Sequence, residues 1–185
     1  MEFHSILEVG ANSGEHLEFV KHKYQRYVLS DLRDVSRALE PVLKENPKAE
    51  FVSADVQSLP FADAEFDRII VTCVLHHLPD PEAALSELLR VSKVGGQIDI
   101  FLPSDPGIFF RFAKWIGPLR KAKKKGLSRV KRLVDARDHI NHSFGLTQLI
   151  RNVFASHKIK HVSYPVRGMP LDLSLWNVYR IIKTS

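Results

Sequence analysis

The chain has 185 residues, of which 44% are hydrophobic and 26% are charged. This length and balance are typical of one globular unit with a sizeable core, so we expect a single domain over residues 1–185. No apolar run is long enough to span a bilayer, no secretory segment follows Met1, and the lone Cys73 excludes an internal disulfide. We therefore expect a cytoplasmic protein.

The net charge of +6 originates in one short segment. Eight lysines and arginines lie between Leu119 and Arg132 with no acidic residue among them. These eight exceed the whole excess of positive charge, so the remainder of the chain is net negative. The sequence thus predicts a local basic patch and not a generally basic protein.

Apolar runs and turn residues predict strands and helices that alternate along the chain. Strands are expected over 5–9, 26–30, 50–53, 67–72, 97–102, 158–163 and 175–183, and helices over 14–22, 35–44, 81–92, 108–117 and 146–155. Pro81 at a helix start and Gly95-Gly96 beyond its end are the expected punctuation. This alternation indicates an α/β fold, a doubly wound and mostly parallel sheet.

The first predicted strand runs directly into a glycine-containing turn. The segment Ile6–Gly14 reads Ile-Leu-Glu-Val-Gly-Ala-Asn-Ser-Gly and is followed by Asp31 and Asp55. Such a turn lets backbone N–H groups approach a polar ligand closely. A carboxylate about 20 residues further on can accept both hydroxyls of a ribose. The pattern indicates an adenosine-containing cofactor.

The spacing of the glycines separates the cofactor classes. A dinucleotide fingerprint requires glycine where this chain has Asn12 and Glu15. Glu15 would also oppose a pyrophosphate, and no Gly-Lys-Ser/Thr follows Gly14 as in a P-loop. A cofactor without phosphates, such as S-adenosylmethionine, fits better.

Five segments, in the same order, resemble the class I S-adenosylmethionine-dependent methyltransferases. They lie within residues 5–103 and are Glu8-x-Gly10-x-Asn12-x-Gly14, Tyr27–Asp31, Ala54–Phe61, Phe66–Leu78 and Leu88–Gly96. The resemblance implies a seven-stranded Rossmann-like sheet of order 3-2-1-4-5-7-6 with strand seven antiparallel. It also implies S-adenosylmethionine as the cofactor.

The resemblance assigns the first cofactor contacts. Gly10, Asn12 and Gly14 would form the loop against the cofactor, although glycines can also serve turns alone. Glu8 would hold the amino group of the cofactor, directly or through water, or would be a solvated carboxylate that caps a helix. Asp31 would accept the ribose hydroxyls.

Further contacts are expected around the adenine. Asp55 would accept from its amino group while the N–H of Val56 meets a ring nitrogen, or Asp55 would only cap a loop. Cys73, at the end of the fourth strand, completes the predicted cofactor-binding set.

Histidines are the candidate catalytic residues. His76 follows the carboxyl end of a central strand, and His139 and His142 are three apart, so they would share one face of a helix. Any of them could take the proton of a hydroxyl acceptor, although packing roles compete in each case. The spacing of the paired histidines at 76 and 77 predicts no metal site.

Residues 103–145 are predicted to form a lid or substrate-selecting insertion. Apolar residues from Ile108 to Ile116 recur at helical spacing ahead of the basic run Arg120–Arg132. The helix could pack on the core, or it could lie on an anionic membrane surface. The basic run could bind a phosphorylated substrate or, most simply, form a solvated mobile loop at Lys121–Lys125.

The expected activity is methyl transfer to a small-molecule acceptor, a hydroxyl of a sugar, polysaccharide precursor or lipid-linked metabolite. The family's helical segment before the first strand is absent from this sequence, so the lid would come from residues 103–142 or a partner, or the chain would be a truncated form. The alternative is a non-catalytic binding subunit with the methyltransferase fold, or an RNA-binding methyltransferase partner. Nucleic acid binding is not expected, because the basic run lacks interleaved aromatics, and a homodimer is allowed.

Overall fold

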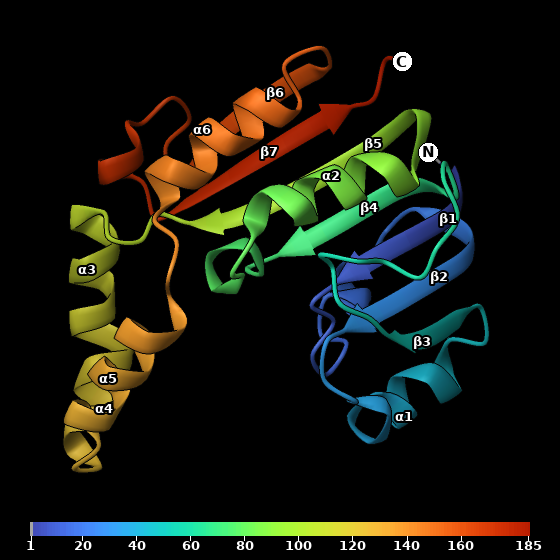
Figure 1. Ribbon diagram of the computed structural model, residues 1–185. Coiled ribbons are helices and arrows are strands. Elements are labelled where there is room, and N and C mark those ends of the chain that lie inside the picture. Colours follow the sequence, from blue (N-terminus) through green and yellow to red (C-terminus); the bar gives the residue numbers. More distant parts are fainter. Residues whose placement is uncertain (1) are drawn as a thin grey trace.

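A computed structural model describes residues 2–185, and its centre is a seven-stranded sheet (Figure 1). The strand order is β3-β2-β1-β4-β5-β7-β6, and β7 runs antiparallel to both neighbours. The predicted order and the antiparallel seventh strand are therefore confirmed. The strands are β1 (Glu2–Val9), β2 (Lys23–Asp31), β3 (Ala49–Ser53), β4 (Phe66–Thr72), β5 (Ser92–Pro103), β6 (Lys158–Tyr164) and β7 (Trp176–Ile182).

Helices connect the strands, and α1, α2 and α6 pack against the sheet (Figure 1). They are α1 (Ser36–Glu45), α2 (Pro81–Val91), α3 (Ile108–Lys114), α4 (Arg120–Lys124), α5 (Ser128–Asp138) and α6 (Ser143–Val153), with short turns η1 (Leu17–Phe19), η2 (Leu75–His77), η3 (Trp115–Leu119) and η4 (Leu171–Leu173). The start of α2 shows how sequence sets a boundary. Pro81 occupies its first position, and the Asp80 carboxylate accepts a 3.0 Å hydrogen bond from the Ala83 N–H.

Alternating side chains of the central strands fill two cores, one on each face of the sheet. On one face, Leu7 and Val71 belong to a buried cluster with Leu85 of α2 and Ile150 of α6. On the other face, Ile6, Tyr27 and Ile70 pack with Leu39 of α1 and Leu17 of η1. Each residue named in these two clusters is at most 6% exposed. Burial on both faces explains the nearly continuous apolar runs of the parallel strands.

The predicted helix over 14–22 is wrong. Residues 17–19 form only a single 3₁₀ turn, and β2 begins at Lys23, three residues before its predicted start. The Ser13 hydroxyl donates to Glu15 at 2.6 Å, and Gly14 has a φ of +78°. These local bonds and the left-handed glycine compete with helix initiation, and one turn suffices to bury Leu17.

Residues 108–138 form a helical hairpin beyond the carboxyl end of β5 (Figure 1). The predicted helix over 108–117 is present as α3 and the wider turn η3. The basic run is not the predicted mobile loop, since α4 and α5 place most of it in helices. None of the helices in the described residues is long and apolar enough to cross a membrane.

Candidate active site

The turn after β1 brings backbone to the carboxyl edge of the sheet. The N–H groups of Gly10 and Ala11 both donate to the Ser30 carbonyl of β2, at 2.8 and 2.9 Å. Gly10 has a φ of +78°, and a Cβ there would lie 2.3 Å from Cγ2 of Val74. Glycine is therefore required at position 10 by backbone conformation and by the close approach of the loop after β4.

Asp31 ends β2 beside this turn and is held as a carboxylate. It is 8% exposed, and burial disfavours its charge. Hydrogen bonds from the side chain and N–H of Arg33 and from the N–H of Asn12, all at 3.0–3.2 Å, outweigh that burial and lower its pKa below the ordinary value. An ionised carboxylate at this position can accept hydrogen bonds from a hydroxyl pair.

Asp55 follows Ala54, whose N–H donates to the Asp31 carbonyl, and is oriented by Gln57. The backbone N–H and the side-chain amide of Gln57 donate to the Asp55 carboxylate at 2.9 and 3.1 Å. The side-chain Oε1 of Gln57 accepts a hydrogen bond from the N–H of Asp80. The Asp55 carboxylate is thus fixed at the cavity wall, next to Val56.

These residues surround a cavity of about 680 Å³ at the carboxyl ends of β1, β2 and β4. Its size, apolar walls and few fixed polar groups fit an adenosine-containing molecule. Six of the eight predicted cofactor-binding residues line it. The lining comprises Val9, Gly10, Asn12, Asp31, Leu32, Arg33, Ala54, Asp55, Val56, Gln57, Thr72, Cys73, Val74, His77, Leu78 and Pro79.

Glu8 and Gly14 are the two predicted cofactor residues that do not line the cavity. Glu8 is 2% exposed, accepts from the Tyr27 hydroxyl and lies 3.3 Å from Nδ1 of His16. Burial and the charge of Glu8 raise the pKa of Tyr27, which keeps that hydroxyl a donor. A Cβ at Gly14 would lie 2.9 Å from Leu39, so this glycine packs against α1.

Cys73 lines the cavity as an uncharged thiol. It lies just beyond β4 with a φ of +57°, and its N–H donates to the Phe101 carbonyl of β5 at 3.0 Å. Burial raises the pKa of its thiol to about 11. The geometry therefore makes Cys73 a wall residue and not a nucleophile.

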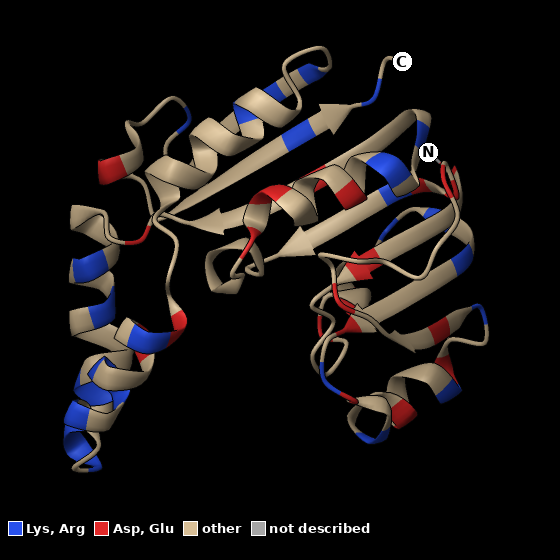
Figure 2. Ribbon diagram, in the orientation of Figure 1, with Lys and Arg blue, Asp and Glu red and all other residues tan. Residues whose placement is uncertain are grey.

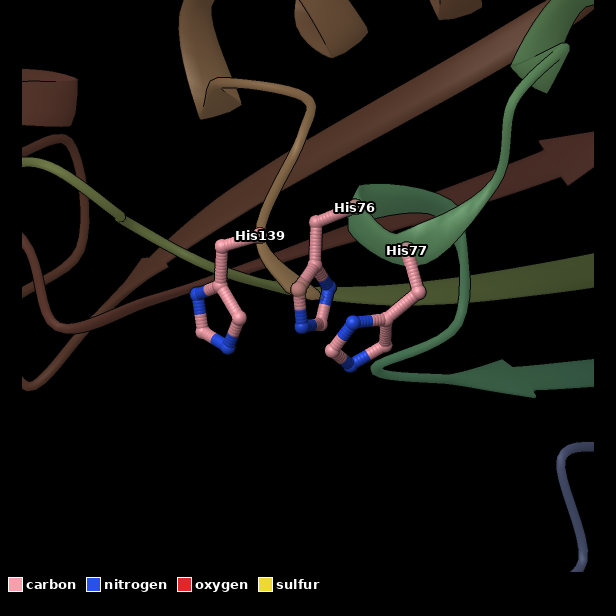
Figure 3. A group of neighbouring side chains, drawn as sticks. All are labelled: His76, His77 and His139. Atoms are coloured by element: carbon pink, nitrogen blue, oxygen red, sulfur yellow. The ribbon is translucent and has the colours of Figure 1, made fainter. Parts of the chain in front are cut away.

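The adjacent His76 and His77 lie together with His139, which is remote from them in the chain (Figure 3), and His77 of this cluster lines the cavity. The ring centroids of His76 and His77 are 3.9 Å apart, and that of His139 is 4.6 Å from His76 and 5.1 Å from His77. The N–H groups of Ile140 and Asn141 donate to the His76 carbonyl, which fastens the chain after α5 to η2.

The three rings differ in their surroundings. His76 is 4% exposed, and among the described residues its Nδ1 has no hydrogen-bond partner. Burial, then the nearby His77 and His139, lower its pKa to about 3, so its ring is neutral and weakly basic near pH 7. Nδ1 of His77 lies 2.7 Å from the Asp138 carbonyl.

His139 is paired with a carboxylate that sequence reasoning missed. Its Nδ1 lies 2.5 Å from Oδ2 of Asp105, in the loop after β5. An ionised carboxylate only accepts hydrogen bonds, so in the neutral ring Nδ1 carries the proton and Nε2 is the acceptor. Lys114 lies 3.5 Å from the same carboxylate and 3.1 Å from Asp135. The position of Asp105 beyond the carboxyl end of a central strand was its only sequence signal.

A second cavity of about 870 Å³ opens between α3 and α5, and His139 is part of its lining. His142, the third predicted catalytic residue, lines it but does not join the cluster of three rings. Its lining combines aromatic and charged side chains, and includes Asp105, Arg111, Phe112, Lys114, Trp115, Leu119, Arg132, Asp135 and His139.

The three histidines are close enough to be compared with a metal site, which the sequence did not predict. One ring nitrogen from each of His76, His77 and His139 lies within 4.8 Å of the others, an arrangement that the sequence did not suggest because His139 is remote in the chain. The rings of His76 and His77 pack on one another, and Nδ1 of His139 is committed to Asp105. The absence of a bound metal stays a prediction.

Comparison with known proteins identifies the family of the chain. The family model described as a methyltransferase domain matches residues 7–100, about half of the chain. An uncharacterized protein of Mycobacterium tuberculosis is 33% identical over 118 residues, 62% of this chain and 43% of that protein. Phosphatidylethanolamine N-methyltransferase of Cereibacter sphaeroides is 30% identical over 122 residues, 64% of this chain and 56% of that enzyme.

A shorter match joins demethylmenaquinone methyltransferase of Renibacterium salmoninarum, 36% identical over 63 residues, 34% of this chain and 27% of that enzyme. The chain thus spans between about a quarter and about half of the length of these relatives.

Solved structures share the fold. A S-adenosylmethionine-dependent methyltransferase of Thermotoga maritima superposes with a TM-score of 0.66 at 19% identity, covering 99% of this chain and 83% of that one. A methyltransferase of Haloferax volcanii, solved in complex with the activator Trm112, gives 0.69 at 13% identity, covering 100% and 84%. The family match, the sheet order and the cavity at the glycine turn together place this chain in the class I S-adenosylmethionine-dependent methyltransferase family.

Proposed function

We propose that the protein transfers the methyl group of S-adenosylmethionine to a hydroxyl of a sugar or lipid-linked acceptor. The observation that carries this proposal is the meeting of two cavities at the histidine cluster. His77 lines the cavity with the glycine turn and Asp31, His139 lines the cavity between α3 and α5, and their ring centroids are 5.1 Å apart.

The first cavity supplies cofactor contacts. Asp31 would accept from the ribose, Asp55 and Val56 would contact the adenine, and the turn at Gly10 would lie against the remainder of the molecule. When bound, S-adenosylmethionine supplies an activated methyl group. The contribution of the chain is then alignment of the acceptor in line with that group and exclusion of water.

His139 is placed to take up the proton of a hydroxyl acceptor. Asp105 holds Nδ1, so that Nε2 of the neutral ring can accept, and His139 lines the second cavity beside His77, which lines the first. Of the three predicted catalytic histidines, His76 has a pKa of about 3 and is a weak base, and His142 lies outside the cluster. His139 is therefore the base that the geometry supports best.

The second cavity supports the class of acceptor. Phe112, Trp115 and Leu119 offer apolar and aromatic surface, and Arg111 and Arg132 offer cations that would suit a phosphate linkage. Two relatives are named for phosphatidylethanolamine and demethylmenaquinone. An acceptor that joins an apolar tail to a polar or phosphorylated head is consistent with this lining.

The test is a methyl-transfer assay with labelled S-adenosylmethionine and an acceptor panel of lipid-linked sugars, free sugars, phosphatidylethanolamine and demethylmenaquinone. With the acceptor that turns over, we expect His139→Gln to lower kcat by about 100- to 10,000-fold with little change in KM for the cofactor. The matched control is His157→Gln, which alters a histidine remote from both cavities.

Undiminished turnover in His139→Gln would show that the base lies elsewhere or that the acceptor needs no base. An unprotonated amine is an acceptor of that kind. Saturable cofactor binding without turnover of any acceptor would instead favour the alternative, a non-catalytic binding subunit. Absence of cofactor binding would contradict the assignment of the first cavity.

A further inference from the structure

The first turns of the hairpin expose an apolar face. Ile108, Phe109, Phe112, Trp115 and Ile116 recur at helical spacing along α3 and η3, and each is 43–65% exposed. The opposite face carries Phe110, which is 8% exposed and packs edge-on against Trp176 of β7. The helix therefore contacts the body of the protein through a narrow side and presents its broad apolar side outward.

The returning helix exposes further large apolar side chains. Leu127, Val130, Leu133 and Val134 of the turn and α5 are 45–61% exposed. Large apolar side chains gathered over two adjacent helices are unusual on the surface of a monomeric protein, and such patches mark interaction sites.

Positive charge is concentrated on the same hairpin. No acidic residue occurs between Pro106 and Val134, a segment with ten lysines and arginines. Figure 2 shows most of these cations gathered at the end of the hairpin that points away from the sheet. Eight of them are exposed and form no ion pair with any residue in 2–185: Arg111, Arg120, Lys121, Lys123, Lys124, Lys125, Arg129 and Arg132.

We propose that the hairpin formed by α3, η3, α4 and α5 docks on the surface of an anionic lipid membrane. Exposed aromatic and aliphatic side chains can enter the headgroup boundary, where Trp115 is a favoured side chain. Unpaired lysines and arginines are attracted to anionic headgroups, and each of them adds a comparable contribution to the membrane affinity. Charge complementarity selects this partner over a neutral apolar one.

The orientation of the hairpin would also place the second cavity next to the membrane. Phe112 and Trp115 belong to the exposed apolar face and line the cavity next to His139. Docking would bring the opening of this cavity to the lipid surface, so that an acceptor could enter without leaving the bilayer. This connection rests on the proposed function, whereas the docking itself does not require turnover.

The experiment measures co-sedimentation of the full chain with vesicles of phosphatidylcholine alone or with phosphatidylglycerol added. We expect binding to the anionic vesicles, weak binding to the neutral ones, and loss of binding at high salt. The triple variant Lys121→Gln, Lys123→Gln and Lys124→Gln should bind anionic vesicles about 100-fold more weakly. The double variant Phe109→Ser and Ile116→Ser should bind about tenfold more weakly.

The matched control removes the same charge elsewhere through Lys21→Gln, Lys158→Gln and Lys160→Gln, all exposed residues outside the hairpin. It should bind like the wild type. Equal loss in the control, or no binding by the wild type, would overturn the proposal.

Two further outcomes would also overturn it. Tighter binding to a short RNA than to vesicles, unaffected by the Phe109/Ile116 variant, would identify a nucleic-acid surface. A dimer in solution that the Phe109/Ile116 variant dissociates would show that a second copy covers this face.

Discussion

At the scale of single residues, Asp31 is the most direct test of the cofactor site. Its carboxylate is 8% exposed and oriented by the N–H groups of Asn12 and Arg33. A hydrogen bond to a charged group contributes about 1.5–3 kcal/mol. We therefore expect Asp31→Ala to weaken the binding of S-adenosylmethionine by about 10- to 100-fold in calorimetric titration while the circular dichroism spectrum is retained.

The control is Asp34→Ala, three residues further on, where the carboxylate is exposed and caps the N–H of Ser36. Affinity should be unchanged there. Equal affinity of Asp31→Ala and the wild type would show that the ribose is bound elsewhere.

His76 makes stability depend on pH. Burial lowers its pKa to about 3, whereas the same side chain in an unfolded chain titrates near its ordinary value of 6.5. The stability that comes from the neutral ring is present above pH 6.5 and is lost as pH falls toward 3, because only the unfolded state then binds the proton. Between pH 7 and 5 the wild type should lose about 2 kcal/mol more than His76→Leu.

Urea unfolding at both pH values measures this difference. The exposed His4 provides the control, since His4→Asn should lose the same stability between the two pH values as the wild type. Parallel loss in the wild type and His76→Leu would show that the ring of His76 is protonated in the folded state or solvated.

At the scale of elements, the hairpin is fastened to the loop after β4 by Asn141. Its side-chain amide donates to the carbonyls of Leu75 and Leu78, at 3.2 and 2.7 Å. Without this amide the two carbonyls lose their partner. We expect Asn141→Ala to cost about 1–3 kcal/mol in the docking of residues 103–142 and to speed hydrogen exchange in both α5 and η2.

Asn152→Ala is the matched control, because Asn152 is exposed on α6 and its amide makes no hydrogen bond within residues 2–185. Exchange in α5 should be unaffected there. Unchanged exchange in Asn141→Ala would mean that the backbone bonds to His76 hold the segment alone.

The same contrast between local and distant contacts explains what the sequence could predict. The central strands follow from local apolar runs, and the glycine turn with Asp31 follows from spacing along the chain. The pairing of His139 with Asp105 joins residues far apart in the chain, so no local pattern announces it. The helix predicted over 14–22 failed because side-chain bonds at Ser13 and Glu15 are invisible to periodicity.

At the scale of the whole molecule, Asp99 joins the parallel part of the sheet to its antiparallel edge. Asp99 lies on β5, and its carboxylate accepts hydrogen bonds from Arg68 of β4 at 2.7 Å, from Arg180 of β7 at 2.7 Å and from Gln97 at 2.6 Å. The side chains of Asp99 and Arg68 are only 11% and 16% exposed, so this charge pair is poorly screened by solvent.

Removing the charge of Asp99 leaves the largely buried guanidinium of Arg68 without its charged partner. We therefore expect Asp99→Asn to lower the free energy of unfolding by about 3 kcal/mol in urea titration. Asp63→Asn removes an equally short pair with Arg90, but the Asp63 side chain is 80% exposed, so its cost should stay below about 1 kcal/mol. Equal losses would mean that solvent screens both pairs alike, and that packing alone aligns β7 with the parallel strands that carry the cofactor cavity.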